Sequence, residues 1–316
     1  MYSNKKLNRS AETSLNTGFG DNASNYGGRF LNKNGNANIS KVGMRWFEKY
    51  SWFHSMLSLT WLQFFLLMVL FFIGVNLAFA VIYYFFGNLS GIHSETKAQA
   101  FSEAFFFSAQ TFTTVGYGRI SPTGFLTSAI SSFQALMGLL SFAVATGLMY
   151  GRFSQPRSYL KFSHNALIAP YKTIKAIMFR VAPYKNTTLT EAEVKITLAL
   201  RVEENGVIVN RFYPLDLEFS KINALTLSWT IVHPITETSP LFSLGVDDIQ
   251  GMKGEILVYL KAFDDMFSNV VVARTSYVAS ELIMDAKFLP MYHRDENNSA
   301  TILDLQKINA YTSTAD

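Results

Sequence analysis

The stretch Thr114-Val115-Gly116-Tyr117-Gly118 decides the fold of this 316-residue chain. Glycine has no Cβ and adopts positive φ at no steric cost, so two glycines spaced by one residue let the backbone alternate in handedness. Such alternation turns successive carbonyl oxygens towards one axis, where they can replace the water around a cation. We predict that the Thr114 hydroxyl adds a lower ring of oxygens and that Val115 and Tyr117 point away and pack behind the carbonyls. One chain supplies one wall of such a pore, which predicts an oligomer around one axis.

Two long apolar stretches flank this motif, residues 60–86 and 124–150. Each is longer than the ~20 apolar residues that cross a bilayer. Only 16% of the chain is charged, below the ~25% typical of soluble domains. The second stretch is rich in Ser, Thr, Ala and Gly, as expected of a helix that packs closely and lines water. We predict two membrane-spanning helices rather than buried helices of a soluble core.

The segment between these spans is too short to cross the membrane twice as helices. Residues 87–97 are polar, and residues 98–112 form a helical run with aromatic side chains that leads directly into the motif. Irregular backbone at membrane depth is tolerated only where it is buried in protein or lines a cavity. We therefore predict a pore domain over residues 60–153, in the order helix, re-entrant helix, carbonyl-lined turn, helix.

Basic residues lie before the first span and after the second. They are Lys41, Arg45, Lys49, Arg152, Arg157 and Lys161. The connecting segment has no positive excess, so the positive-inside rule predicts that both termini are cytoplasmic, in the cell's inner (plasma) membrane. All of these residues except Lys41 are also candidates to bind anionic lipid headgroups, at ~1 kcal/mol per contact. Plain topology signals would explain the same residues.

The N-terminal region has two predicted parts. Residues 40–59 mix basic and aromatic residues, as in an amphipathic helix that lies along the membrane interface. Residues 1–39 are rich in Asn, Ser and Gly and have few large apolar groups, which predicts a flexible tail.

The chain changes character after the second span. Short β-branched runs separated by turn signals predict an antiparallel β-sandwich over residues 154–316. Its acidic residues could line an ion path or a solvated outer face. Those considered are Glu203, Glu204, Asp247, Asp248, Asp264 and Asp265.

Other chemistries find little support in the sequence. The chain has no cysteine, which excludes disulfides and thiol catalysis. Its five histidines are scattered without ligand spacing, and it has neither a Walker A motif nor GxGxxG. The net charge of +4 is spread along the chain, so no nucleic-acid partner and no enzyme are indicated.

The pentapeptide at 114–118 is the established example of a potassium-selective carbonyl filter. Together with the stretches at 151–157, 162–169, 227–235 and 273–277, it resembles the inward-rectifier potassium channels, most of all their bacterial members. The resemblance covers about residues 46–305. It implies a membrane α + β fold in which a two-helix pore is followed by an immunoglobulin-like cytoplasmic β-sandwich.

The resemblance also implies a function. It implies a homotetramer that conducts K⁺ passively, with gating at the inner mouth and by the cytoplasmic domain, and no organic cofactor. The K⁺ ions would be held at Thr114, Val115, Gly116 and Tyr117. Two alternatives stay open. One is a two-span potassium channel of another gating class, against which the missing Gly-rich nucleotide loop argues. The other is a non-conducting membrane sensor, against which the intact filter argues.

The resemblance also implies roles for several residues of the second span. Gly138 is similar to the family's inner-helix glycine, where the helix could bend or simply pack closely. Phe142 occupies the position where strong rectifiers carry an acid, so weak rectification is expected. Tyr150 falls at the narrow inner mouth, where four rings could close the pore by excluding water; the alternative is an aromatic residue at the membrane interface.

Four further polar residues are assigned near the filter. Gln134 is expected on the pore-facing side of the second span. Gln110 replaces a Glu that pairs, in many relatives, with a basic residue beyond the filter. We therefore expect Arg119 to face the outer vestibule. Glu103, near the start of the re-entrant helix, is expected to interact with the helix dipole.

Overall fold

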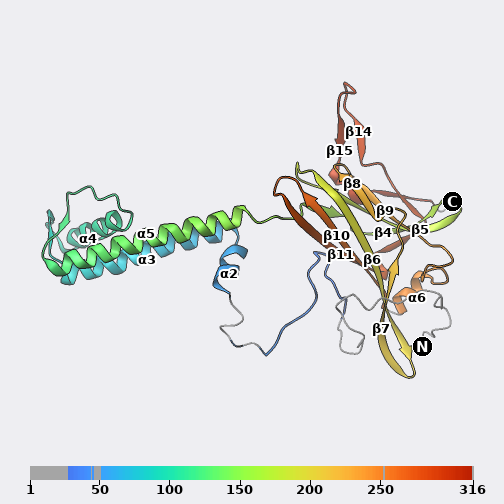
Figure 1. Cartoon of the computed structure of the whole chain (residues 1–316), viewed down its shortest axis with the longest axis horizontal. Coiled ribbons are helices and arrows are strands. Elements are labelled where there is room, and N and C mark those ends of the chain that lie inside the picture. Colours follow the sequence, from blue (N-terminus) through green and yellow to red (C-terminus); the bar gives the residue numbers. More distant parts are fainter. Residues whose placement is uncertain (1–27, 44, 46–50, 252, 315–316) are drawn as a thin grey trace. The chain divides into compact units, whose positions relative to one another are not determined.

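The computed structural model of the chain describes residues 28–43, 45, 51–251 and 253–314, and it divides into two compact units (Figure 1). One unit is Val42–Gln155 and is helical. The other joins the described residues up to Lys41 to the chain from Pro156 onwards and consists mainly of strands.

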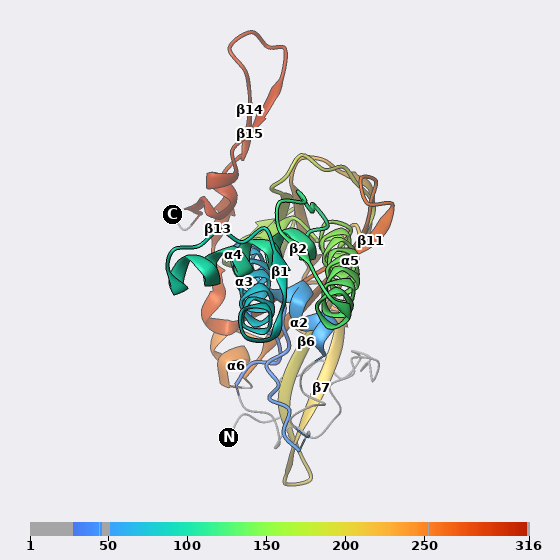
Figure 2. The same cartoon turned by 90° about the vertical axis from the view of Figure 1, so that its left-hand side faces the viewer.

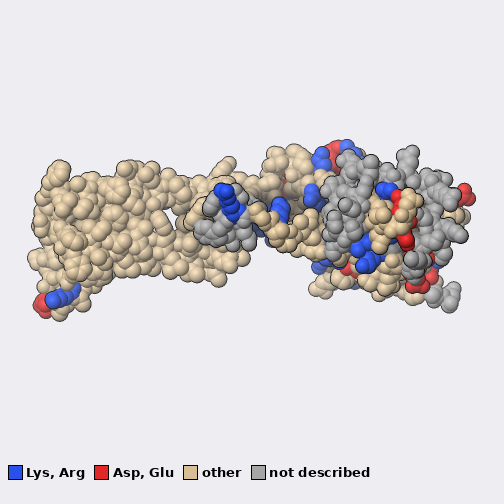
Figure 3. All heavy atoms as spheres, turned by 90° about the horizontal axis from the view of Figure 1, so that it is seen from below, with Lys and Arg blue, Asp and Glu red and all other residues tan. Residues whose placement is uncertain are grey.

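Two helices of the first unit, α3 (Trp61–Phe86) and α5 (Phe125–Phe153), are long and apolar enough to cross a membrane. They run side by side (Figures 1 and 2). Helix α3 begins at a capping box in which the Thr60 side chain accepts from the Gln63 N–H and the Gln63 side chain accepts from the Thr60 N–H. The helical unit shows few charged atoms on the face seen in Figure 3, as its solvent would be lipid.

The re-entrant helix α4 (Lys97–Phe112) is too short to span a bilayer. It also begins at a capping box, formed by Thr96 and Gln99. The loops on either side are joined by a two-stranded antiparallel pair, β1 (Leu89–Ser90) and β2 (Ser121–Pro122). This pairing returns the chain after the motif to the level at which α4 begins.

The interfacial helix has a narrower described range than the predicted residues 40–59. Helix α2 covers Trp52–Ser58. Residues 44 and 46–50, which include Lys49, lie outside the described residues.

The second unit is built on two five-stranded sheets. In the first, β6 (Leu189–Glu204) pairs with β7 (Val207–Leu215), β8 (Lys221–Leu225) and β10 (Glu255–Asp264), and β10 pairs with β11 (Asn269–Val278). In the second, β5 (Ile174–Pro183) pairs with β3 (Leu160–Phe162), β4 (Ala166–Tyr171) and β9 (Trp229–Pro234), and β4 pairs with β12 (Leu282–Met284). All pairs are antiparallel except the parallel pair of β12 and β4.

The two sheets share one hydrophobic core, which defines a β-sandwich. Phe179 and Ile231 from one sheet and Leu198, Leu260 and Tyr277 from the other are almost fully buried in it. Short elements complete the unit. They are α6 (Val246–Gly251), the 3₁₀ turns Ala279–Glu281 and Leu305–Asn309, β13 (Ala286–Phe288) paired with β16 (Tyr311–Ser313), and β14 (Tyr292–Arg294) paired with β15 (Thr301–Leu303).

The described part of the N-terminal segment packs against the β-sandwich, which differs from the flexible tail predicted for residues 1–39. Phe30 and Leu31 are buried, and the Glu255 carboxylate accepts their N–H groups at 2.5 and 3.0 Å. Arg29 donates to the Ser276 hydroxyl at 2.7 Å and pairs with Glu281 at 3.2 Å. Long-range contacts hold this polar segment, and its composition gave no sign of them. Residues 1–27 lie outside the described residues.

Candidate functional site

The backbone of the motif alternates in handedness. Thr114, Gly116 and Gly118 have φ of 59°, 52° and 82°, and Val115 and Tyr117 are not among the residues with positive φ. The two glycines behave as their lack of a Cβ predicts. The positive φ of Thr114 was not predicted from the sequence, because a left-handed conformation is uncommon in a residue other than glycine.

The end of α4 holds the start of the motif. The Gln110 carbonyl accepts the N–H of Val115 at 2.9 Å and that of Gly116 at 3.3 Å, and the Thr111 carbonyl accepts the N–H of Thr114 at 3.1 Å. The position of α4 therefore sets the position of the first three residues of the motif. Within the single chain, Val115 and Tyr117 are 53% and 78% exposed. This chain's own atoms therefore cover only part of the two residues that we predicted to pack behind the carbonyls.

Arg119 and Glu103 form an ion pair, which we did not predict for either residue. The chain after the motif turns back over the first half of α4, as the β1–β2 pairing shows, and this brings the guanidinium to the carboxylate. The Arg119 side chain is half exposed, so the pair contributes about 0–1 kcal/mol.

Gln134 does not lie on an exposed face of α5, where we expected it. It is fully buried, and its amide bonds to Tyr83 of α3 at 2.7 Å and Ser108 of α4 at 2.7 Å. The rotation of α5 about its axis turns this position towards its own subunit's helices.

Gly138 lies where α5 crosses the end of α4. A Cβ built on it would overlap the Phe112 carbonyl oxygen. This contact favours the close-packing interpretation of Gly138 over a bend, because only glycine lets the two backbones approach so closely.

Phe142 and Tyr150 lie on the exposed side of α5, with 73% and 74% of their side chains accessible. An apolar hollow of about 1010 Å³ in the helical unit is lined by Phe142 and Gly138 together with Thr114 at the inner end of the motif. The fold thus brings the base of the motif and the middle of α5 to one hollow, while Tyr150 is not among its lining residues.

Arg152 bonds to residues of its own unit, whereas we predicted that it contacts lipid headgroups. It is 9% exposed and donates to the carbonyls of Met56 and Leu59 at 2.6 Å each and of Leu57 at 3.3 Å. Its guanidinium also stacks on the rings of Trp61 and Phe64, at 4.9 and 4.8 Å from their centres. Arg152 therefore caps the end of α2, where the helix dipole favours a cation.

The remaining lipid candidates are placed individually. Arg45, Arg157 and Lys161 are exposed, and Lys49 lies outside the described residues.

Among the acidic residues, Asp264 is fully buried and accepts the Met266 N–H at 2.9 Å, which fits neither an ion path nor a solvated face. Arg211 hydrogen-bonds Glu204 and holds the pKa of that carboxyl below its usual value.

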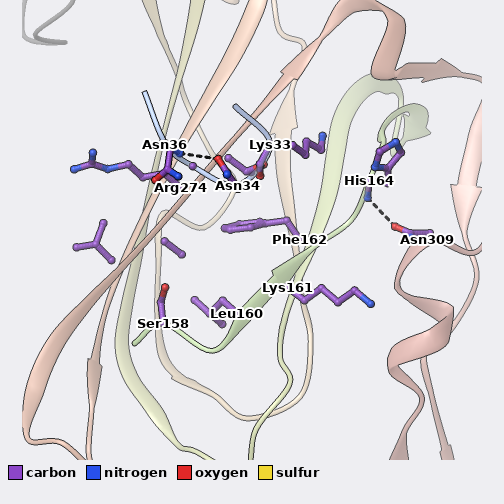
Figure 4. Close-up of a pocket in the computed structure, with 14 residues that line it drawn as sticks. Lys33, Asn34, Asn36, Ser158, Leu160, Lys161, Phe162, His164, Arg274 and Asn309 are labelled. Carbon is purple, nitrogen blue, oxygen red and sulfur yellow. Dashed lines mark hydrogen bonds between the residues drawn. The ribbon is translucent and has the colours of Figure 1, made fainter. Parts of the chain in front are cut away.

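A cavity of about 640 Å³ in the β unit is lined partly by the N-terminal segment (Figure 4). In this view Arg274 extends to one side of the cavity, and Lys33 and Lys161 extend to the other side at separate heights. Lys33 bonds to the Ser276 carbonyl at 3.1 Å and pairs with Glu281. Because the positive groups do not converge, we assign no ligand to this cavity.

Two apolar spans that flank a re-entrant helix and a turn of alternating handedness, followed by a β-sandwich, define a two-span ion channel. Family models agree: an ion-channel model matches residues 59–155, and the model of the inward rectifier potassium channel C-terminal domain matches residues 160–315.

The chain belongs to the inward-rectifier potassium channel family. It is 31% identical over 269 residues to the inward rectifier potassium channel Kirbac3.1 of Paramagnetospirillum magnetotacticum, which covers 84% of this chain and 89% of that relative. The ATP-sensitive inward rectifier potassium channel 12 of Bos taurus and the inward rectifier potassium channel 18 of Homo sapiens are each 29% identical over 296 residues. These matches cover 85% of this chain and 68% and 67% of the relatives. The chain is thus a membrane protein that transports K⁺, and not an enzyme, which confirms the predicted family, the predicted fold class and K⁺ transport.

Sequence reasoning missed three polar residues that the structure brings to Gln134 in the helical unit: Asn76, Tyr83 and Ser108. Asn76 gave a signal, because it interrupts the apolar run of the first span. The rotation of each helix, which decides that these side chains meet, could not be read from that run.

Proposed function

We propose that four copies of this chain surround one axis and that the carbonyls of Thr114–Tyr117 replace the water shell of K⁺ there. The observation that carries this proposal is the alternation of φ at Thr114, Gly116 and Gly118, because alternation is what lets neighbouring carbonyls face a common axis. The exposed Val115 and Tyr117 side chains support a tetramer, in which neighbouring copies would cover them. Thr114 would add its hydroxyl at the inner end.

The proposed orientation has both termini in the cytoplasm and the filter open to the outside. The basic residues before α3 and after α5 support this orientation. Exposed Arg45 and Arg157 are the residues best suited to meet anionic headgroups. Phe142 supplies no charge to the hollow, which supports weak block by internal polycations.

Rubidium uptake tests conduction directly. Liposomes that contain the purified chain and are loaded with K⁺ should accumulate radioactive rubidium from outside, since Rb⁺ is close to K⁺ in size. Barium has nearly the size of K⁺ but twice the charge, and should block this uptake. Empty liposomes are the control. Uptake no higher than in empty liposomes would support the non-conducting sensor instead.

We also propose that Tyr150 forms the inner gate. Its ring is exposed on α5, and four such rings around the axis would leave little room for hydrated K⁺, with no carbonyls to offset dehydration. Tyr150→Ala should therefore raise the open probability, while K⁺ over Na⁺ selectivity stays the same. Single-channel recordings measure both quantities.

Phe153→Ala is the matched control for the gate, because Phe153 is an exposed aromatic residue three positions further on that stacks on Trp61 at 4.9 Å. It should leave the open probability near the wild-type value. An unchanged open probability in Tyr150→Ala would show that Tyr150 is instead an aromatic residue of the membrane interface.

A further inference from the structure

A continuous chain of hydrogen bonds crosses the helical unit and joins its three long helices. The Tyr83 hydroxyl of α3 donates to Gln134 Oε1 of α5 at 2.7 Å. Gln134 Nε2 donates to the Ser108 hydroxyl of α4 at 2.7 Å, and that hydroxyl donates to Asn76 Oδ1 of α3 at 2.8 Å. The Asn76 amide finally donates to the Phe72 carbonyl at 2.8 Å. We call Tyr83, Gln134, Ser108 and Asn76 the interhelical network.

The direction of these bonds is set by the backbone. Gln134 Nε2 also lies 3.1 Å from the Ser108 carbonyl oxygen. A carbonyl only accepts, so the amide atom that faces it must be the nitrogen, and the amide oxygen must then face Tyr83. Each polar atom of the two amides and of the Ser108 hydroxyl has a partner, so the network has one arrangement rather than two.

The interhelical network is buried where polar groups are unfavourable. Asn76, Ser108 and Gln134 are fully buried, and Tyr83 is 1% exposed. Polar side chains inside a membrane segment must bond to one another, and apolar residues would pack there without that requirement. Their presence therefore indicates a role that shape alone does not fill.

The network acts on the same helix that holds the filter. Ser108 precedes Gln110 by two residues, and the Gln110 carbonyl accepts the N–H groups of Val115 and Gly116. A hydrogen bond is directional, so bonds from α3 and α5 to Ser108 fix both the depth and the rotation of α4. The close approach of Gly138 to the Phe112 carbonyl is not a hydrogen bond and limits only how closely α5 and α4 approach.

We propose that the interhelical network is a positioning device for ion selection, in which Gln134 and Ser108 hold α4 at the setting that gives the filter its K⁺ width. These residues do not touch the ion and act through the Gln110 carbonyl. The inference rests on the proposed role of the Thr114–Tyr117 carbonyls. According to this inference, residues outside the filter contribute to the channel's selectivity for K⁺.

The test measures the permeability of Na⁺ relative to K⁺, from reversal potentials of reconstituted channels in planar bilayers. Ser108→Ala and Gln134→Leu should each raise this ratio by about threefold to fifteenfold, the factor that loss of one hydrogen bond inside a membrane protein produces. The double variant should change the ratio no more than the larger single change, because both break the same chain of bonds.

Ser102→Ala is the matched control. Ser102 lies on α4 and is exposed, and among the described residues its hydroxyl bonds only to the Ala98 carbonyl of its own helix, at 2.9 Å. The Na⁺ to K⁺ permeability ratio of Ser102→Ala channels should equal that of the wild type. A purely structural role for the network would lower the yield of channels and leave the ratio of those that remain unchanged, which would overturn the proposal.

Tyr83→Phe keeps the test decisive if the other variants do not assemble. It removes only the hydroxyl and leaves Gln134 Oε1 without its donor. A raised Na⁺ to K⁺ ratio in Tyr83→Phe supports the proposal, and a wild-type ratio overturns it. Wild-type channels that do not discriminate K⁺ from Na⁺ would instead contradict the proposed filter, so the two failures are distinguishable.

Discussion

Gly116→Ala should lower rubidium uptake by at least about a thousandfold while leaving the oligomer assembled. Gly116 has φ of 52°, and an L-residue in the left-handed region costs roughly 1–2 kcal/mol. In the proposed tetramer this cost is incurred four times, which gives about 4–8 kcal/mol. Since each 1.4 kcal/mol is about tenfold in population, the filters with aligned carbonyls become about 10³- to 10⁶-fold rarer.

The measurement is rubidium uptake into liposomes, with size-exclusion chromatography to check assembly. Gly74→Ala is the matched control: Gly74 lies inside α3 without positive φ, and a Cβ there meets no atom within 4 Å. It should conduct like the wild type. Selective, barium-sensitive uptake at the wild-type rate by Gly116→Ala would contradict the assignment of these carbonyls.

Arg152→Leu should have the second largest effect, on the stability of the helical unit. The change leaves three carbonyls at the end of α2 without their donor, and each unsatisfied buried acceptor costs about 1–3 kcal/mol. We expect a loss of at least about 3 kcal/mol in the free energy of unfolding. Circular dichroism in detergent with increasing SDS measures this loss, and rubidium uptake should fall with it.

Arg152→Lys separates a helix cap from a lipid contact. Lysine keeps the positive charge but lacks the planar fork that reaches Met56 and Leu59 together and stacks on Trp61. If Arg152 caps α2, Arg152→Lys should lose most of the stability that Arg152→Leu loses. The exposed Arg157 is the control, because Arg157→Leu should change any dependence on anionic lipid and leave stability unaltered. Wild-type stability in Arg152→Lys would return Arg152 to the lipid-binding residues.

Much of the fold could be predicted because it depends on local properties of the chain. The apolar lengths predicted residues 60–86 and 124–150 as spans, and α3 and α5 cover Trp61–Phe86 and Phe125–Phe153. Helix α5 continues three residues beyond the predicted end, to Phe153, and Arg152 in this extension donates to the carbonyls of Met56 and Leu59.

Contacts near the filter were missed for two reasons, which are the rotation of helices and the return of the chain over α4. A run of apolar residues predicts that a helix crosses the membrane but says little about which side faces the pore. Gln134 was therefore expected on the pore side, whereas it bonds to Tyr83 and Ser108. Arg119 and Glu103 are sixteen residues apart, and only the return of the chain over α4 makes them a pair.

The sequence by itself determined the turn of alternating handedness at residues 114–118, the two spans, the β-rich second half and membership of the channel family. Each of these follows from a property carried by a few neighbouring residues: the freedom of glycine at 116 and 118, apolar length, or β-branched alternation. Tertiary structure alone decided that Gln134 holds α4, that Arg152 caps α2, and that Phe30 and Leu31 bind Glu255. These depend on partners tens to hundreds of residues away, whose positions are set by how helices and sheets pack and not by the residues beside them.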